Sequence, residues 1–222
     1  MLRKAHLAGQ ESTKKMFSEY DPVQPQFKKI DMAVEDAPTD SYVAYTGLSE
    51  DWDPFIMYPV RSSPNSTIPM MRTFENAKGV AAHENTHAIN WAVPVGKNRF
   101  STESGGYYGP SPMYPQKYAE KFAAKGRDPW TQSPEEFLAE TNNLLTHFNL
   151  AGVPMSNWPK NIKNEIINLL KYRFNFTHSD TEEILRAHEK IVNDINAEQA
   201  AYGSYLKSLA ASKDISKPLY QQ

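Results

Sequence analysis

The chain has 222 residues and a formal net charge of −2, which is enough length for one domain with a substantial core. No basic block of the kind that binds phosphate backbones is present, so we expect no nucleic-acid partner. The absence of cysteine excludes disulfides, thiolate metal sites and a cysteine nucleophile. No apolar run reaches the roughly 20 residues of a membrane span, and no signal peptide is visible. We therefore expect a soluble protein that is cytoplasmic, virion-associated or exported without a classical signal.

The first part of the chain, residues 1–40, is expected to form an extension. Residues 2–7 have the composition of a short helix, but Pro22 and Pro25 interrupt any longer element. Residues 27–34 carry enough apolar side chains to dock on another surface. Such an arm is a candidate for contacts with a partner chain.

Three short segments that follow have the composition of β-strands. Residues 42–46 and 55–58 are rich in β-branched and aromatic side chains. Residues 67–71 form a third extended piece, which Pro69 confines to a sheet edge because proline lacks the N–H of a strand ladder. These segments predict a small sheet.

The most informative segment is an H-E-x-x-H motif within residues 73–93, which we interpret as a helix that Pro94 terminates. Positions i and i+4 share one helix face, so His83 and His87 project side by side. Two imidazoles in this arrangement can bind Zn²⁺ and leave room for a third ligand and a water. Glu84 lies beside them and can accept a proton from that water.

Three further helices are expected, at residues 114–124, 133–150 and 161–174. The second is the best marked, because Ser133 suits the N-cap and Pro134 the first helical position. A glycine-, proline- and tyrosine-rich loop precedes the first of them.

A last long helix is expected from about Asp180. Apolar and aromatic residues recur along it in alternating steps of four and three, with two polar breaks. These positions are Ile184, His188, Ile191, Ile195, Glu198, Tyr202, Tyr205 and Leu209. We expect the stripe to pack on the core or to pair with a partner chain. The remaining histidines, His6, His147, His178 and His188, are expected at helix surfaces or partly buried.

The third metal ligand has to come from elsewhere in the chain. A metzincin would have glycine and histidine at the positions that Asn90 and Val93 occupy, so that branch is excluded. Glu136 and Glu140 share a face of the later helix. One of them could bind the metal while the other accepts the N–H of a ligand histidine and so orients it.

The motif H-E-x-x-H-A, followed in a later helix by E-F-x-A-E, resembles the catalytic domain of the anthrax lethal factor and Pro-Pro endopeptidase group of zinc peptidases. The resemblance covers about residues 80–150. It implies that Glu136 joins the two histidines as the third Zn²⁺ ligand. It also implies that Glu140 contacts a ligand side chain without binding the metal itself, and that Glu84 is the general base.

The chain departs from that group in two places. Asn85 and Thr86 replace an apolar–glycine pair, and Pro129 stands where the group has a tyrosine that stabilises the oxyanion. We therefore expect a tyrosine from another segment to take over, with Tyr114 and Tyr118 as our principal candidates. The full set in that segment is Tyr107, Tyr108, Tyr114 and Tyr118.

A structural role competes for the predicted ligand glutamate. Ser133 and Glu136 have the spacing of a capping box, in which the glutamate side chain returns to the start of its own helix. Because two histidines require a third ligand, we favour the metal for Glu136. Glu135 and Glu140 are the alternatives.

These patterns together predict an α+β fold of the zincin-like metalloprotease type, with a small mixed sheet, a metal-binding helix and a helical C-terminal part. We expect residues 41–176 to form the catalytic domain and residues 177–222 a long C-terminal helix. The expected function is zinc-dependent hydrolysis of peptide or protein substrates. The alternative is a structural or interaction protein on the same scaffold, such as a virion or secreted-complex component. It would assemble as a homo- or hetero-oligomer through the N-terminal arm or the C-terminal helix.

Overall fold

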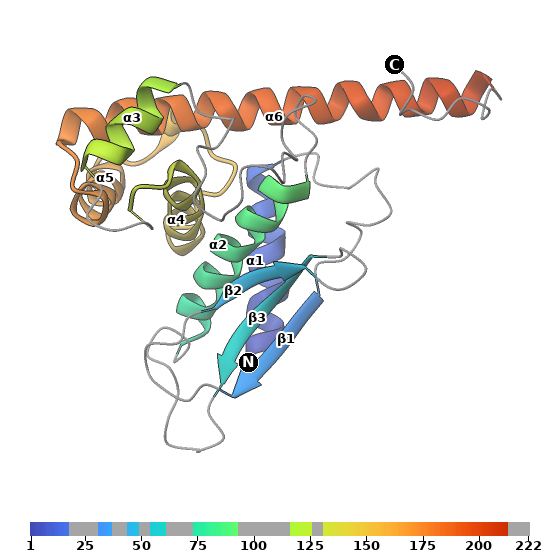
Figure 1. The fold of residues 1–222 in the computed structure, drawn as a ribbon, viewed down its shortest axis with the longest axis horizontal. Helices are drawn as coiled ribbons and strands as arrows, with labels where there is room; N and C mark the ends of the chain where they lie inside the picture. Colours follow the sequence, from blue (N-terminus) through green and yellow to red (C-terminus); the bar gives the residue numbers. More distant parts are fainter. Residues whose placement is uncertain are drawn as a thin grey trace.

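The computed structural model describes residues 1–17, 31–36, 44–48, 54–60, 73–92, 116–125 and 131–212. The fold is of mixed α+β type, mostly helical, with one three-stranded sheet (Figure 1). The elements in chain order are α1 (Leu2–Met16), β1 (Asp31–Asp36), β2 (Tyr45–Leu48), β3 (Pro54–Val60), α2 (Phe74–Ala92), α3 (Gln116–Lys125), α4 (Pro134–His147), a 3₁₀ turn (Met155–Asn157), α5 (Lys160–Phe174) and α6 (His178–Ser212).

The sheet is mixed, as the sequence predicted, with β3 between the other two strands. β1 runs parallel to β3 and β2 runs antiparallel to it. The expected strands at 42–46 and 55–58 correspond to β2 and β3, whereas the extended piece at 67–71 lies outside the described residues. β3 continues through Pro59 to Val60, beyond the expected strand. β2 pairs with the first four residues of β3, and β1 pairs with Phe55–Val60, which includes Pro59.

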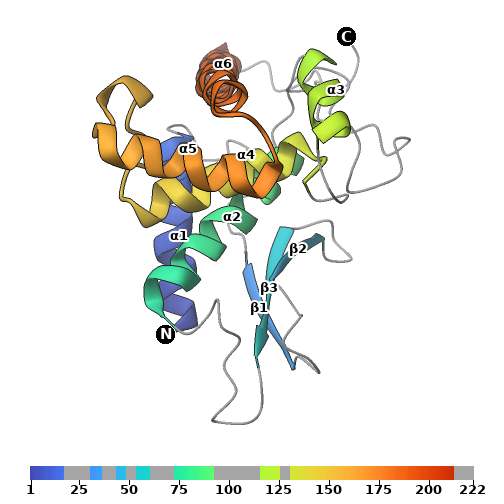
Figure 2. The same ribbon diagram turned by 90° about the vertical axis from the view of Figure 1, so that its left-hand side faces the viewer.

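The residues expected to form an N-terminal extension contribute α1 and β1 to the same core. α1 lies against α2 on one face of the sheet (Figure 2), and Ala5, Met16 and Phe17 are buried. The two helices approach closely at Gly9, where an added Cβ would lie 2.5 Å from the Cβ of Ala81. Small residues rather than large apolar ones make this contact.

A cluster of four phenylalanines joins the helical half of the fold. Phe122 of α3 and Phe137 of α4 pack edge to face, with ring centroids 5.6 Å apart. Phe174 and Phe176, at and beyond the end of α5, complete the cluster with centroid distances of 4.9 to 6.3 Å. The cluster anchors α4, whose first turn carries the candidate ligand glutamate.

α6 is a long helix whose N-terminal part packs on the core and whose C-terminal part does not follow the other described elements (Figure 1). Ile184, Leu185, Ile191 and Val192 are buried against the rest of the fold. The C-terminal part extends beyond the other described elements (Figure 1). In the parts of the chain that the structure describes, no helix is both long and apolar enough to cross a membrane.

Two of the four remaining histidines differ from the expectation. His147 and His178 are exposed, but His6 and His188 are only 4% and 3% exposed. His6 is buried because α1 packs into the core, where its Nδ1 lies 2.9 Å from the Tyr58 hydroxyl. His188 is buried because it lies on the face of α6 that meets the core.

Candidate metal centre

Two helices bring the predicted ligands together. His83 and His87 lie on successive turns of α2, and Glu136 lies in the first turn of the neighbouring α4. Each offers one ligand atom, and these atoms all lie within 4.8 Å of one another. His87 and Glu136 are each 7% exposed. Among the described residues, this group contains Glu136 and neither Glu135 nor Glu140.

The distances within the group suit a tetrahedral ion. The two histidine Nε2 atoms are 3.2 Å apart. His87 Nε2 lies 3.3 Å from Glu136 Oε1, and His83 Nε2 lies 3.4 Å from Glu136 Oε2. Zinc bonds to nitrogen and oxygen of about 2.0–2.1 Å give a regular tetrahedron edges of about 3.3–3.4 Å. The distance between the two Nε2 atoms is close to one such edge, and the Glu136 carboxylate presents one oxygen to each imidazole at a similar distance.

The orientation of His83 leaves a lone pair directed at the centre. Its Nδ1 lies 3.4 Å from Glu140 Oε2, which is the position from which an N–H can donate to that carboxylate. With the proton on Nδ1, Nε2 has a lone pair with which to bind a cation, and it lies 3.2 Å from the Nε2 of His87. Two imidazoles and a carboxylate at this spacing are a donor set that fits a metal ion.

The electrostatics of the centre favour positive charge. Burial alone would lower the pKa of His83, but the carboxylates of Glu136 and Glu140 raise it to about 10. Burial works in the opposite direction on Glu136, yet its contacts with His83 and His87 hold the pKa of this carboxyl well below its usual range. A protonated His83 supplies the positive charge in the metal-free protein that a bound ion would otherwise supply.

Glu84, the predicted general base, is 7% exposed and lies beside the two histidines. Burial raises its pKa, and the charges of His83 and His87 and the hydroxyl of Thr46 oppose that rise. The Thr46 hydroxyl lies 2.9 Å from Glu84 Oε2 and 2.7 Å from the Glu84 carbonyl oxygen. A buried carboxylate with a raised pKa and a fixed partner is suited to accept a proton.

Glu140 connects the centre to a third helix. Its Oε2, which faces His83, also accepts from Asn143 Nδ2 at 3.3 Å, and its Oε1 lies 3.6 Å from Arg173 Nη1 of α5. Burial would raise the pKa of Glu140, but His83 and Arg173 outweigh it and lower the pKa. Glu140 therefore stays ionised and can hold the His83 ring in one orientation.

The predicted competition between capping and metal binding involves different atoms of Glu136. Its backbone N–H donates to Ser133 Oγ at 3.4 Å, and Ser133 is the N-cap of α4, as predicted. Its carboxylate instead faces the imidazoles of His83 and His87. Capping fixes the backbone of the ligand while its side chain remains available.

A buried amide fixes the position of α4 along α2. Asn142 Nδ2 donates to Thr86 Oγ1 at 2.7 Å and to the carbonyl of Ala82 at 3.1 Å, both in α2. It also lies 3.1 Å from Thr13 Oγ1 of α1. Thr86, a departure from the resembled motif, is thus part of the contact that sets Glu136 opposite the histidines.

The tyrosine candidates are not placed by the structure. Tyr107, Tyr108 and Tyr114 lie outside the described residues. Tyr118 belongs to α3, but its side chain is outside the described part of that helix. The tyrosine that the structure does place near Glu84 is Tyr58, whose pKa is raised by burial and by the charge of Glu84.

Sequence reasoning did not find Tyr58 or Thr46. Both lie in strands far from the motif in sequence, and no spacing rule connects them with it. The only signal is strand alternation, which predicts which side chains of β2 and β3 face the helices. It does not predict which helical residue each side chain meets.

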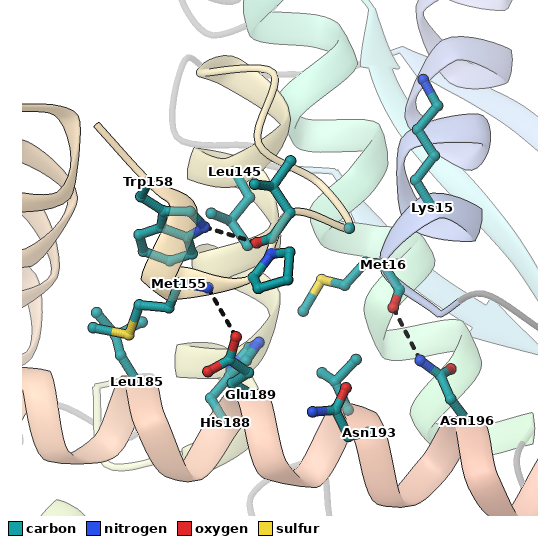
Figure 3. A pocket seen from close by; sticks show the side chains of 14 residues that line it. Lys15, Met16, Leu145, Met155, Trp158, Leu185, His188, Glu189, Asn193 and Asn196 are labelled. Carbon is teal, nitrogen blue, oxygen red and sulfur yellow. Dashed lines mark hydrogen bonds between the residues drawn. The ribbon is translucent and has the colours of Figure 1, made fainter. Parts of the chain in front are cut away.

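A separate cavity of about 280 Å³ lies between the end of α1, residues 152–158 and α6 (Figure 3). Two hydrogen bonds join the elements that line it. The Met155 N–H donates to Glu189 of α6, and the Asn196 side chain of α6 donates to the Met16 carbonyl of α1. His188 also lines it. Neither ring nitrogen of His188 has a hydrogen-bond partner among the described residues, and burial lowers its pKa to about 3.

Comparisons with protein-family models, with curated proteins and with solved structures find no match for this chain.

Proposed function

We propose that the protein is a zinc-dependent endopeptidase with a zincin-like catalytic domain, similar in its site to the lethal factor and Pro-Pro endopeptidase group. The observation that carries the proposal is the convergence of His83, His87 and Glu136 at tetrahedral spacing. Two imidazoles and a carboxylate are a zinc donor set that leaves a fourth position open.

The fold supports the same proposal. β2 is an edge strand of the sheet, and its Thr46 meets Glu84 of α2. α4 supplies Glu136, whose carboxylate faces His87 of α2. A metal helix between an edge strand and a glutamate-bearing helix is the arrangement that we expect of a zincin.

The chain's own residues would divide the chemistry between them. Zinc, when bound, would polarise the scissile carbonyl and increase the acidity of the attacking water. Glu84 would take the proton that leaves this water and pass it to the nitrogen of the departing amine. Glu140 would hold His83 in orientation throughout, and Asn143 and Arg173 would hold Glu140.

The experiment is cleavage of a diverse peptide library by zinc-loaded protein, with Glu84→Gln as the matched variant. The amide of glutamine has nearly the size of the carboxylate but cannot take the proton. We expect the wild type to cleave a subset of peptides, and Glu84→Gln to keep its zinc and cleave none. Loss of zinc in Glu84→Gln would contradict the role proposed for Glu84.

A second candidate function is a structural or interaction protein on the same scaffold. The observation that favours it is the part of α6 that extends beyond the other described elements (Figure 1). Stoichiometric zinc without cleavage of any peptide, together with self-association that is lost on truncation after residue 194, would favour this candidate.

A further inference from the structure

Thr46 of β2 makes a polar contact with Glu84 of the motif. The hydroxyl oxygen lies 2.9 Å from Glu84 Oε2 and 2.7 Å from the backbone carbonyl of the same residue. Thr46 is 1% exposed. Water does not reach this hydroxyl, so its interaction with Glu84 is not exchanged for solvent.

Both partners are held firmly. Thr46 pairs with Ile56 in the ladder between β2 and β3, and Ile56 is fully buried. A β-branched side chain on a strand has few rotamers, so this backbone anchor also fixes the hydroxyl. Glu84 is set in the middle of α2. The contact therefore fixes the orientation of the Glu84 carboxylate.

The neighbouring residues offer Glu84 other positions. Its carboxylate lies near enough to His83 and His87 for their charges to act on it, and Glu136 is close as well. Without a fixed partner, the carboxylate would be free to adopt other orientations among these charged groups. A buried charged oxygen left without a partner is also costly.

We propose that Thr46 is the positioning residue of Glu84. This inference rests on the proposed function. The Thr46 hydroxyl, which rotates to suit its partners, donates to Glu84 Oε2 and lies against the Glu84 carbonyl oxygen, so it fixes the orientation of the carboxylate. The other carboxylate oxygen, Oε1, is then the one that takes the proton when the O–H bond of the attacking water breaks, and the proton leaves from there with the amine.

Side-chain chemistry makes this testable. Thr46→Val keeps the shape and removes the hydroxyl, whereas Thr46→Ser keeps the hydroxyl. Thr181→Val is the matched control, because Thr181 of α6 is also buried and its hydroxyl donates to the carbonyl of Thr177, which directly precedes α6, away from the centre.

We expect Thr46→Val to lower kcat about 10–100-fold with KM and zinc content unchanged, as for loss of a hydrogen bond to a charged group. Thr46→Ser and Thr181→Val should stay within about threefold of the wild type. In a Glu84→Ala background, Thr46→Val should lower the residual rate no further, because residues that act through one another are not additive. An equal loss in both backgrounds, or no rescue by serine, would overturn the inference.

A second measurement does not need activity. Equilibrium unfolding of the wild type, Thr46→Val, Glu84→Ala and the double variant gives a coupling between the two side chains. We expect the double variant's unfolding constant to differ from the product of the single effects by about fivefold or more. Coupling without peptide cleavage by the wild type would contradict the proposed function and leave Thr46 as the holder of Glu84. Cleavage without coupling would contradict the inference alone.

Discussion

Glu136 Oε1 of α4 lies 3.3 Å from His87 Nε2 of α2, in a position where an isolated capping glutamate would instead fold back on its own helix. The buried amide of Asn142 in α4 links the same two helices. It donates to Thr86 Oγ1 at 2.7 Å and to the Ala82 carbonyl at 3.1 Å, both in α2. The packing of α2 on α4 therefore also sets the geometry of the metal centre.

The two glutamates of α4 should differ in their effect on zinc affinity. Glu136→Ala removes a ligand and should abolish stoichiometric binding. Glu140→Ala removes the partner of His83 Nδ1 and should weaken binding about 10–100-fold, as outer partners of ligand histidines typically do. Competition with a chromogenic chelator measures both affinities. The reverse order would make Glu140 the ligand and leave Glu136 as part of the cap.

The oxyanion partner remains a prediction from the sequence. Removing one donor to a developing oxyanion typically costs about 10²–10³ in rate. If Tyr114 or Tyr118 supplies this donor, its substitution by phenylalanine should lower kcat about a hundredfold with zinc content unchanged. Tyr107→Phe and Tyr108→Phe test the other two tyrosines of the segment. A fast wild type that none of the four substitutions slows would contradict the prediction that a tyrosine of this segment stabilises the oxyanion.

His188 should make the fold sensitive to acid. Its pKa in the folded protein, about 3, lies below the ordinary value of 6.5, so the unfolded chain takes up the proton first as the pH falls. Above about pH 6.5, His188 is neutral in both states and the free energy of unfolding is at its full value. Between pH 6.5 and 3, this free energy falls because only the unfolded chain binds the proton. Between pH 7.5 and 5, we expect the wild type to lose about 2 kcal/mol of unfolding free energy that His188→Leu does not lose. Denaturant unfolding at both pH values measures this, with the exposed His147→Leu as control. An equal loss in wild type and His188→Leu would show that His188 does not carry the effect.

The parts of the fold that the sequence predicted are those with local signals. Ser133 and Pro134 mark the start of α4, and the motif's i, i+4 spacing predicts the shared face of the two histidines. β3 follows from its run of aromatic and β-branched residues. In each case the residues that carry the signal lie within a few positions of one another in the sequence.

The parts that the sequence did not predict depend on contacts between distant segments. α1 contacts α2 through Gly9, whose lack of a side chain is not a signal for burial. Thr46 meets Glu84 across 38 residues. His6 is buried because it meets Tyr58. No periodicity within one element encodes which residue of another element it will touch.

The most direct test of the account is the zinc content of purified protein after exhaustive dialysis against metal-free buffer. We predict one zinc per chain in the wild type and in His147→Ala, which alters an exposed histidine of α4 outside the centre. We predict none in His87→Ala, because this removes the nitrogen that lies 3.2 Å from His83 Nε2 and 3.3 Å from Glu136 Oε1. A wild type that takes up no zinc, or His87→Ala with full zinc occupancy, would contradict the metal centre and the function proposed from it.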